Sequence, residues 1–154
     1  MPSIALLVSN LALDYPDYTF SPGDHFRWAS DTLEITYDPA DAHAQEHILH
    51  ELAHALLKHS NYDRDIQLIT IERDAWHHAK EILCPRYKVA LADAVIQDAL
   101  DTYRDWLHAR STCPNCHATG MQNKKHHYRC IACRHTWRVN EARVCSLRRY
   151  SLSN

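Results

Sequence analysis

Residues 46–58, EHILHELAHALLK, decide how the first part of the chain is interpreted. Apolar residues recur in this stretch at the spacing of an amphipathic helix, and two histidines, His50 and His54, stand four residues apart. Residues four apart lie on one face of a helix, so both imidazoles can bind the same metal ion. Glu51 stands beside the first histidine, where a carboxylate can act as general base on a water that the metal activates. The pattern predicts a metal site with His50 and His54 as ligands and Glu51 as the catalytic residue.

The chain contains 13 histidines, so a five-residue HExxH pattern can arise by chance. The metal-site interpretation therefore depends on a third ligand, because a catalytic zinc ion uses three protein ligands and one open position. The extended pattern HExxHxxGxxH is excluded, since Leu57 and Ser60 stand where its glycine and third histidine would fall. The candidates that remain downstream are Glu72, Asp74, His77 and His78.

Glu72 is the strongest of these candidates. It shares one stripe of a predicted helix with Ala75, Ala79 and Leu83, and this stripe is the face that must pack inward. The other three candidates project away from the stripe. An acid on a buried face needs a partner, and a metal ion would supply one. We predict Glu72 as the third ligand, with His78 as the alternative.

Short segments before the HExxH helix predict a small sheet. Residues 4–13 are compatible with either a helix or a strand. Residues 32–37, TLEITY, alternate apolar and polar side chains as a half-buried strand does, and residues 25–28 are its expected partner. Asp38 can cap a helix, Pro39 suits its first position and Asp41 its first turn, so we expect the HExxH helix to start at Asp38-Pro39 and to end at about residue 58.

Two further helices are expected downstream. One covers residues 66–83 and ends at Cys84-Pro85, because proline disfavours a helix in the residues before it. The other covers residues 88–110 and has an apolar face. Only two glycines occur in 154 residues, which argues against an all-β fold. The expected fold class is α+β, mostly helical with a small antiparallel sheet.

The charge changes sign along the chain. Residues 1–110 contain 9 basic and 18 acidic residues, whereas residues 111–154 contain 8 basic residues and one acidic residue. This asymmetry predicts two domains, 1–110 and 111–154, with different partners. No apolar run is long enough to cross a bilayer, so we expect a cytoplasmic protein without a membrane partner.

Four of the six cysteines form two CxxC pairs in the basic segment, with the spacing C-x2-C-x13-C-x2-C. Each pair can form a tight knuckle, and two knuckles close a tetrahedral zinc site without an open position. The pattern predicts a structural zinc ion in a zinc ribbon; two disulfides are the alternative, which a reducing compartment disfavours. With the HExxH site, this gives two zinc ions per chain, one catalytic and one structural. The four ligands are Cys113, Cys116, Cys130 and Cys133.

Several side chains of the basic segment extend this prediction. A polar hairpin is expected between the knuckles, with Tyr128 and Trp137 covering the metal cluster. Cys84 and Cys145 have no paired neighbour and are expected to be incidental thiols. The reserve ligands are His117, His126, His127 and His135.

The zinc ribbon is also the candidate binding surface for nucleic acid. Its basic side chains interleave with aromatic ones, a composition suited to phosphate contacts and base stacking. The alternative is a solvated basic face that docks on the acidic domain or on a protein partner. The basic residues are Lys124, Lys125, Arg129, Arg134, Arg138, Arg143, Arg148 and Arg149.

Residues 46–85 resemble the ImmA/IrrE family of zinc metallopeptidases, which pairs HExxH with a glutamate that opens an ExxAxxFA segment. Glu72, Ala75 and Ala79 match that second motif, and the run Ile82 to Pro85 matches its end. The chain departs from the family in having His78 at the aromatic position and in carrying a zinc ribbon.

The resemblance implies a minimal zincin-like domain with a gluzincin-like site, in which His50, His54 and Glu72 bind zinc and Glu51 is the base. It also implies a protein substrate, since members of the family cut repressors. Residues 33–37 are the expected strand for pairing with an extended substrate. The side chain that stabilises the oxyanion is left open among His59, Tyr62 and His78.

Two other functions compete with this interpretation. A SprT-like protease also joins HExxH to a zinc-binding segment and acts on DNA-attached proteins, but it uses a third histidine. A non-catalytic regulator would keep the HExxH group as a structural site and use the zinc ribbon for its contacts. The presence of Glu51 argues against the regulator, because a structural site does not need that carboxylate.

Overall fold

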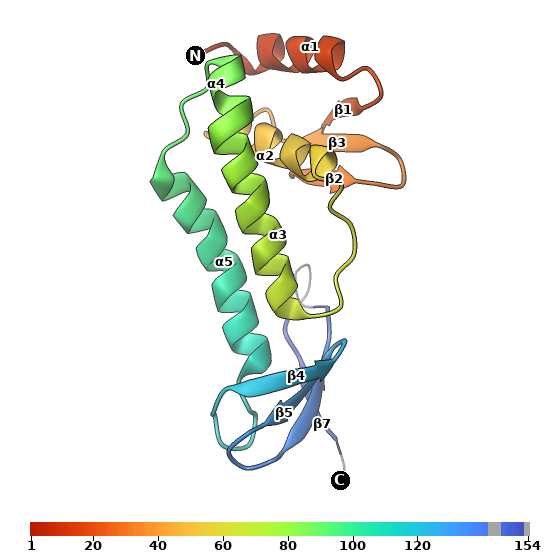
Figure 1. The fold of residues 1–154 in the computed structure, drawn as a ribbon, viewed down its shortest axis with the longest axis vertical. Helices are drawn as coiled ribbons and strands as arrows, with labels where there is room; N and C mark the ends of the chain where they lie inside the picture. The colour runs from red at the N-terminus through yellow and green to blue at the C-terminus, as the bar shows by residue number, and fades with distance from the viewer. Residues whose placement is uncertain (142–145, 153–154) are drawn as a thin grey trace. The chain divides into compact units, whose positions relative to one another are not determined.

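The structure is a computed structural model that describes residues 1–141 and 146–152. Arg143 and Cys145, which the sequence analysis names, lie outside the described residues. The fold is α+β, with helices and two small sheets (Figure 1). The described part of the chain contains no helix that is both long and apolar enough to cross a membrane.

The chain forms two compact units. The first unit comprises residues 1–60 and 71–96, and the second comprises residues 61–70 and 97–154. The second unit therefore takes in two further stretches of chain besides the basic segment that follows residue 110.

The first unit begins with a helix, a small sheet and a second helix (Figure 1). Its elements are α1 (Ile4–Asp14), β1 (Thr19–Pro22), β2 (Arg27–Ala29), β3 (Glu34–Tyr37) and α2 (Ala44–Leu56).

The segment that the sequence left open between helix and strand is helical. The Ser3 side chain caps α1 by accepting a hydrogen bond from the amide of Leu6 at 3.2 Å. Leu7 and Leu11, four residues apart, are fully buried on one face of the helix. They join a core with Ile35 of β3 and the apolar side chains of α2.

The small sheet is mixed, with the strand order β1-β3-β2. β2 pairs antiparallel to β3, as expected, but β1 pairs parallel to β3 on its other side. The expected antiparallel pair is therefore present, and β1, which the sequence analysis does not predict, adds a parallel strand to it. β1 has no clear alternation of apolar and polar residues and ends in a proline, so its sequence does not predict a strand. Because β3 is central and both its edges are paired, the expectation that residues 33–37 pair with a substrate is wrong.

The HExxH helix α2 begins at Ala44, six residues later than expected. Asp38 and Asp41 do not cap it; each accepts a hydrogen bond from the amide two residues ahead, at 2.9 and 2.7 Å. These contacts hold residues 38–43 in turns, in which aspartate competes with the helix for backbone donors.

The next helical stretch continues past the predicted stop. α3 (Asp65–His78) runs into a π-helical turn (Ala79–Leu83) and then α4 (Cys84–Tyr87). Pro85 follows the π-helical turn and lies within this continuous stretch, so Cys84-Pro85 does not end the helix. The helix ends instead at Lys88, which adopts the left-handed conformation at φ 56°.

The remaining elements are α5 (Asp93–Ser111), β4 (Gly120–Lys124), β5 (His127–Cys130), β6 (Thr136–Val139) and β7 (Arg149–Ser151). The four strands form one antiparallel sheet in the order β4-β5-β6-β7. The first three strands carry the hairpin and aromatic residues that the sequence predicts, whereas β7 was not predicted.

The inner face of this sheet forms the core of the second unit. Tyr128 and Trp137 stack with ring centroids 5.6 Å apart and are buried together with Cys113 and Cys130. Gly120 packs so closely against Trp137 that a Cβ at this position would collide with the indole ring. The two aromatic side chains therefore lie against the cysteine cluster, as the sequence predicts.

Candidate metal sites

The first candidate metal site is formed by His50 and His54 of α2 and Glu72 of α3. Their donor atoms all lie within 4.8 Å of one another, and all three residues are buried. His50 Nε2 is 2.9 Å from Glu72 Oε2, and His54 Nε2 is 3.1 Å from His50 Nε2 and 3.4 Å from Glu72 Oε1. Two helices thus direct two imidazole nitrogens and one carboxylate at a common point.

The packing of the two helices fixes these side chains. Trp76, one turn after Glu72 on α3, is fully buried and stacks on the His50 ring with centroids 4.0 Å apart. Ala75 and Ala79 continue the buried stripe of the same helical stretch. The residues that the sequence places on the inward stripe with Glu72 are therefore buried, as predicted.

The separations fit a bound metal ion. Ligand atoms at about 2.0–2.1 Å from a tetrahedral zinc ion are about 3.3–3.4 Å from one another. The three separations of 2.9, 3.1 and 3.4 Å are close to this spacing. The set of two imidazoles and one carboxylate is also a known ligand set for catalytic zinc.

The protonation states favour metal binding at neutral pH. Burial lowers the pKa of His50 to about 4, although the Glu72 carboxylate opposes this shift. Burial acts to raise the pKa of Glu72, but hydrogen bonds from His50 and His54 outweigh it and hold the pKa well below its ordinary value. Glu72 is therefore a carboxylate and His50 a neutral imidazole, the forms in which each side chain binds a cation.

The second nitrogens of the two histidines have different surroundings. His54 Nδ1 is 2.9 Å from Nδ1 of His59, a half-buried side chain three residues after the end of α2. His50 Nδ1 is buried and, among the described residues, has no hydrogen-bond partner. His59, one of the open candidates for the oxyanion, thus lies against a candidate metal ligand.

The other candidates from the sequence lie outside the three-residue group. Asp74 and His77 are exposed and His78 is half-buried, and none of the three contributes a ligand atom. Glu51 follows His50 on α2 and is half-buried. Tyr62 belongs to the second unit and is half-buried.

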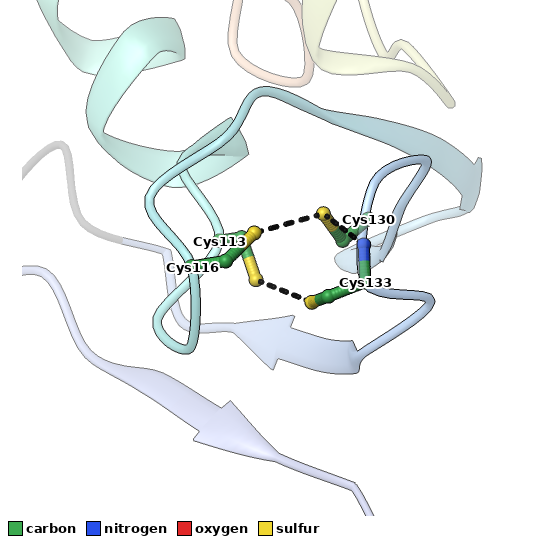
Figure 2. Close-up of side chains that lie close together, drawn as sticks. All are labelled: Cys113, Cys116, Cys130 and Cys133. Atoms are coloured by element: carbon green, nitrogen blue, oxygen red, sulfur yellow. Dashed lines mark hydrogen bonds between the residues drawn. The ribbon is translucent and has the colours of Figure 1, made fainter.

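The second candidate metal site is the cysteine cluster. All four sulfur atoms lie within 4.8 Å of one another, and Figure 2 shows them converging from the two knuckles. Cys113 Sγ is 3.7 Å from Cys133 Sγ, and Cys116 Sγ is 3.5 Å from Cys130 Sγ. These distances are too long for a disulfide and close to the roughly 3.8 Å between thiolates around a tetrahedral zinc ion.

The two knuckles have the same backbone geometry. In each, the residue after the second cysteine, His117 or Arg134, adopts a positive φ of 65°. Its amide donates to the carbonyl of the first cysteine of its pair, at 2.9 and 3.1 Å. Two sequence-separated CxxC segments therefore fold into matching turns that present their sulfur atoms to one centre.

Hydrogen bonds to the sulfurs prepare part of the cluster for ionisation. The side-chain amide of Asn115 lowers the pKa of Cys133 to about 6, and the amide of Cys133 lowers the pKa of Cys130. The amide of Ala118 lowers the pKa of Cys116, but bonds to the neighbouring sulfurs outweigh it and raise the value to about 12. The protein alone thus stabilises some thiolates, while four thiolates together need a cation.

The remaining histidines and the isolated cysteine do not join the cluster. None of the four reserve histidines contributes to the group of ligand atoms within the described residues. Cys84 is buried in the first unit, where burial raises the pKa of its thiol to about 11. It is therefore an inert thiol at neutral pH.

A buried polar network in the second unit was missed by the sequence analysis. Arg110 at the end of α5 donates to both carboxylate oxygens of Asp65, at 2.8 and 3.4 Å, and Tyr128 donates to the same carboxylate at 2.5 Å. Arg110 also donates to the carbonyl of Asn140, and the Trp137 indole donates to the carbonyl of Arg110 at 3.0 Å. Asp65 and Arg110 stand 45 residues apart, so no local pattern signals the pair.

Comparison of the chain with protein-family models, with curated proteins and with solved structures gives no significant match. The chemistry of the two sites is therefore inferred from their own side chains.

Proposed function

We propose that this protein is a zinc-dependent metallopeptidase that hydrolyses a peptide bond in a protein substrate. The convergence of His50 Nε2, His54 Nε2 and the Glu72 carboxylate at a buried point carries the proposal. The adjacent Glu51 favours a catalytic over a purely structural zinc site, because a structural site does not need a general base beside its ligands.

A zinc ion bound there would act as a Lewis acid on the peptide carbonyl and lower the pKa of a water to about 7. Glu51 would take a proton at its carboxylate and return it to the leaving amine. Glu72 would be the third ligand, since its carboxylate lies 2.9 Å from His50 Nε2 and 3.4 Å from His54 Nε2. Trp76 would exclude water from one face of His50.

An extended substrate would pair with β2. This strand lies at an edge of the sheet, and within the described residues it pairs with β3 alone. The residue before it, Phe26, contacts the ring of His47, which in turn lies against Trp76 with ring centroids 5.4 Å apart. Main-chain pairing at β2 would bind a substrate with little dependence on its sequence.

The zinc ribbon would hold the second zinc ion as a structural metal through Cys113, Cys116, Cys130 and Cys133. Its role in the proposal is to bind DNA or the protein partner and so to bring the peptidase to a DNA-bound substrate such as a repressor. The positive charge of residues 111–154 supports this assignment.

Metal content tests the ligands first. Protein purified without chelator is expected to contain two zinc ions per chain, as measured by inductively coupled plasma mass spectrometry. Glu72→Ala should remove one zinc ion, and Cys113→Ser should remove the other. His78→Ala, which changes the alternative candidate, should leave both in place.

Hydrolysis tests the base. The zinc-loaded protein is incubated with a peptide library derived from a whole proteome, and new termini are identified by mass spectrometry. Glu51→Gln should lower cleavage by at least about 100-fold, the usual contribution of a positioned base. Glu46→Gln, the same change five residues earlier on α2, is the matched control and should retain activity.

Three results would contradict the proposal or part of it. Equal cleavage by Glu51→Gln and the parent protein would remove Glu51 from catalysis. A single zinc ion per chain, lost only when a cysteine is changed, would favour the non-catalytic regulator. Loss of the first zinc ion in His78→Ala with retention in Glu72→Ala would favour a histidine-type site like that of SprT-like proteases.

A further inference from the structure

The sheet β4-β5-β6-β7 has one buried face and one open face. Tyr128, Cys130, Trp137 and Val139 point to the buried face. Side chains alternate along each strand, so the intervening residues of β5 and β6 belong to the opposite face. The side chains on that face do not contribute to the core of the second unit.

Strand register brings the open-face side chains into two rows across the sheet. One row runs from Met121 through Arg129 to Thr136, and the other from His127 through Arg138 to Tyr150. Directly paired residues project from the same side of an antiparallel sheet, so the two rows form one continuous surface.

This surface combines positive charge with planar groups. The Arg138 guanidinium lies over the Tyr150 ring, 4.2 Å from its centroid, and the Tyr150 side chain remains accessible with 36% of its surface exposed. Among the described residues, no ion pair or hydrogen bond occupies the guanidinium of Arg129 or Arg138. Lys124 and Lys125 add two exposed cations at the hairpin between β4 and β5.

Negative charge is missing from the surface. The four strands, which lie entirely within the described residues, contain no acidic residue. The single acidic residue from position 111 onward, Glu141, belongs to neither row and lies 3.5 Å from His126. A partner that neutralises this face must therefore supply the negative charge itself.

We infer that the open face of this sheet binds single-stranded nucleic acid, with Tyr150 stacking on a base and Arg129, Arg138, Lys124 and Lys125 contacting phosphates. A planar ring lying on a sheet face can stack only on an unpaired base, which favours a single strand over a duplex. This binding is independent of the proposed peptidase site, which lies in the first unit.

Fluorescence anisotropy of a labelled 15-nucleotide oligothymidylate tests the assignment, with the zinc-loaded full chain at about 50 mM salt. Tyr150→Leu should weaken binding about 5- to 150-fold through loss of stacking, whereas Tyr150→Phe keeps the ring and should bind within about 2-fold of the parent protein. Both changes affect an exposed side chain, and unchanged zinc content will show that the fold is intact.

Salt dependence tests the phosphate contacts. Four cations on a single strand predict a slope of log affinity against log salt of about −2.8, which Arg129→Gln with Arg138→Gln should reduce to about −1.4. Arg73→Gln, the same charge change at an exposed position of α3, should not alter the slope.

Three results would overturn the inference. They are equal binding by Tyr150→Leu and the parent protein, tighter binding of a duplex of the same length, and equally effective competition by poly-glutamate. The last result would indicate an acidic protein as the partner. Glu51→Gln should bind the oligonucleotide unchanged, so failure of the peptidase proposal and failure of this inference are separately visible.

Discussion

The change Asp65→Ala should destabilise the second unit more than any surface substitution. Arg110 is only 1% exposed, and its guanidinium depends on Asp65 for two of its hydrogen bonds. Removing the carboxylate leaves a buried charge without its ion partner, which costs about 3–5 kcal/mol. It also leaves the Tyr128 hydroxyl without its acceptor. A small unit has little stability to spare, so a loss of this size should be readily measured.

The assay is hydrogen exchange by mass spectrometry on zinc-loaded protein, read on peptides that cover residues 127–139. Asp65→Ala should raise exchange in these strands by about 100-fold or more, the factor that corresponds to about 3 kcal/mol. The matched control is Asp63→Ala, an exposed aspartate two residues away, which should change stability by less than about 0.5 kcal/mol.

A double change separates the ion pair from simple loss of packing. Asp65→Leu with Arg110→Leu removes both charges and should be less destabilised than Asp65→Leu alone, because no buried charge remains. Equal exchange in Asp65→Ala and Asp63→Ala would refute the reasoning. So would a double variant whose loss of stability equals the sum of the losses in the two single variants.

Three further outcomes follow from named contacts. Gly120→Ala should destabilise the second unit by about 1–3 kcal/mol in urea unfolding, because its Cβ would collide with a fully buried indole. Burial and the hydrogen bond to Asp65 raise the pKa of Tyr128, so this phenol stays neutral well above pH 10. Its contribution to stability is lost only as the pH rises beyond that range. Tyr128→Phe should therefore leave the phenolate absorbance gained up to pH 11 unchanged. His59→Ala should weaken zinc binding at the first site by about 10- to 100-fold in a chelator competition, because it removes the side chain that orients His54, and His59→Asn should restore part of the loss.

The two groups of candidate ligands could be predicted because their signals are local. A spacing of four residues on a helix places His50 and His54 together whatever the rest of the fold does, and the inward stripe of α3 identifies Glu72. The four cysteines are marked in the same way by their paired spacing.

Element boundaries and distant pairings could not be predicted in this way. The start of α2 depends on whether Asp38 caps a helix or closes a turn, and both uses satisfy the same backbone donors. The strand β1 becomes a strand only through its pairing with β3. Asp65 contacts Arg110, but each of these charged residues, taken alone in the sequence, is predicted to be exposed to solvent.

The network around Asp65 bears on how this protein could have been assembled during evolution. The zinc ribbon looks in sequence like a segment that recombination could append at residue 111 as a finished cassette. Yet Tyr128 and Trp137 complete their hydrogen bonds only with Asp65 and Arg110, which lie upstream of that point. A ribbon transferred by itself would arrive with the Tyr128 hydroxyl unsatisfied. A swap of ribbons between proteins should therefore keep the Tyr128 contact only when Asp65 travels with the ribbon, whereas the acceptor of Trp137 is a main-chain carbonyl that any residue supplies.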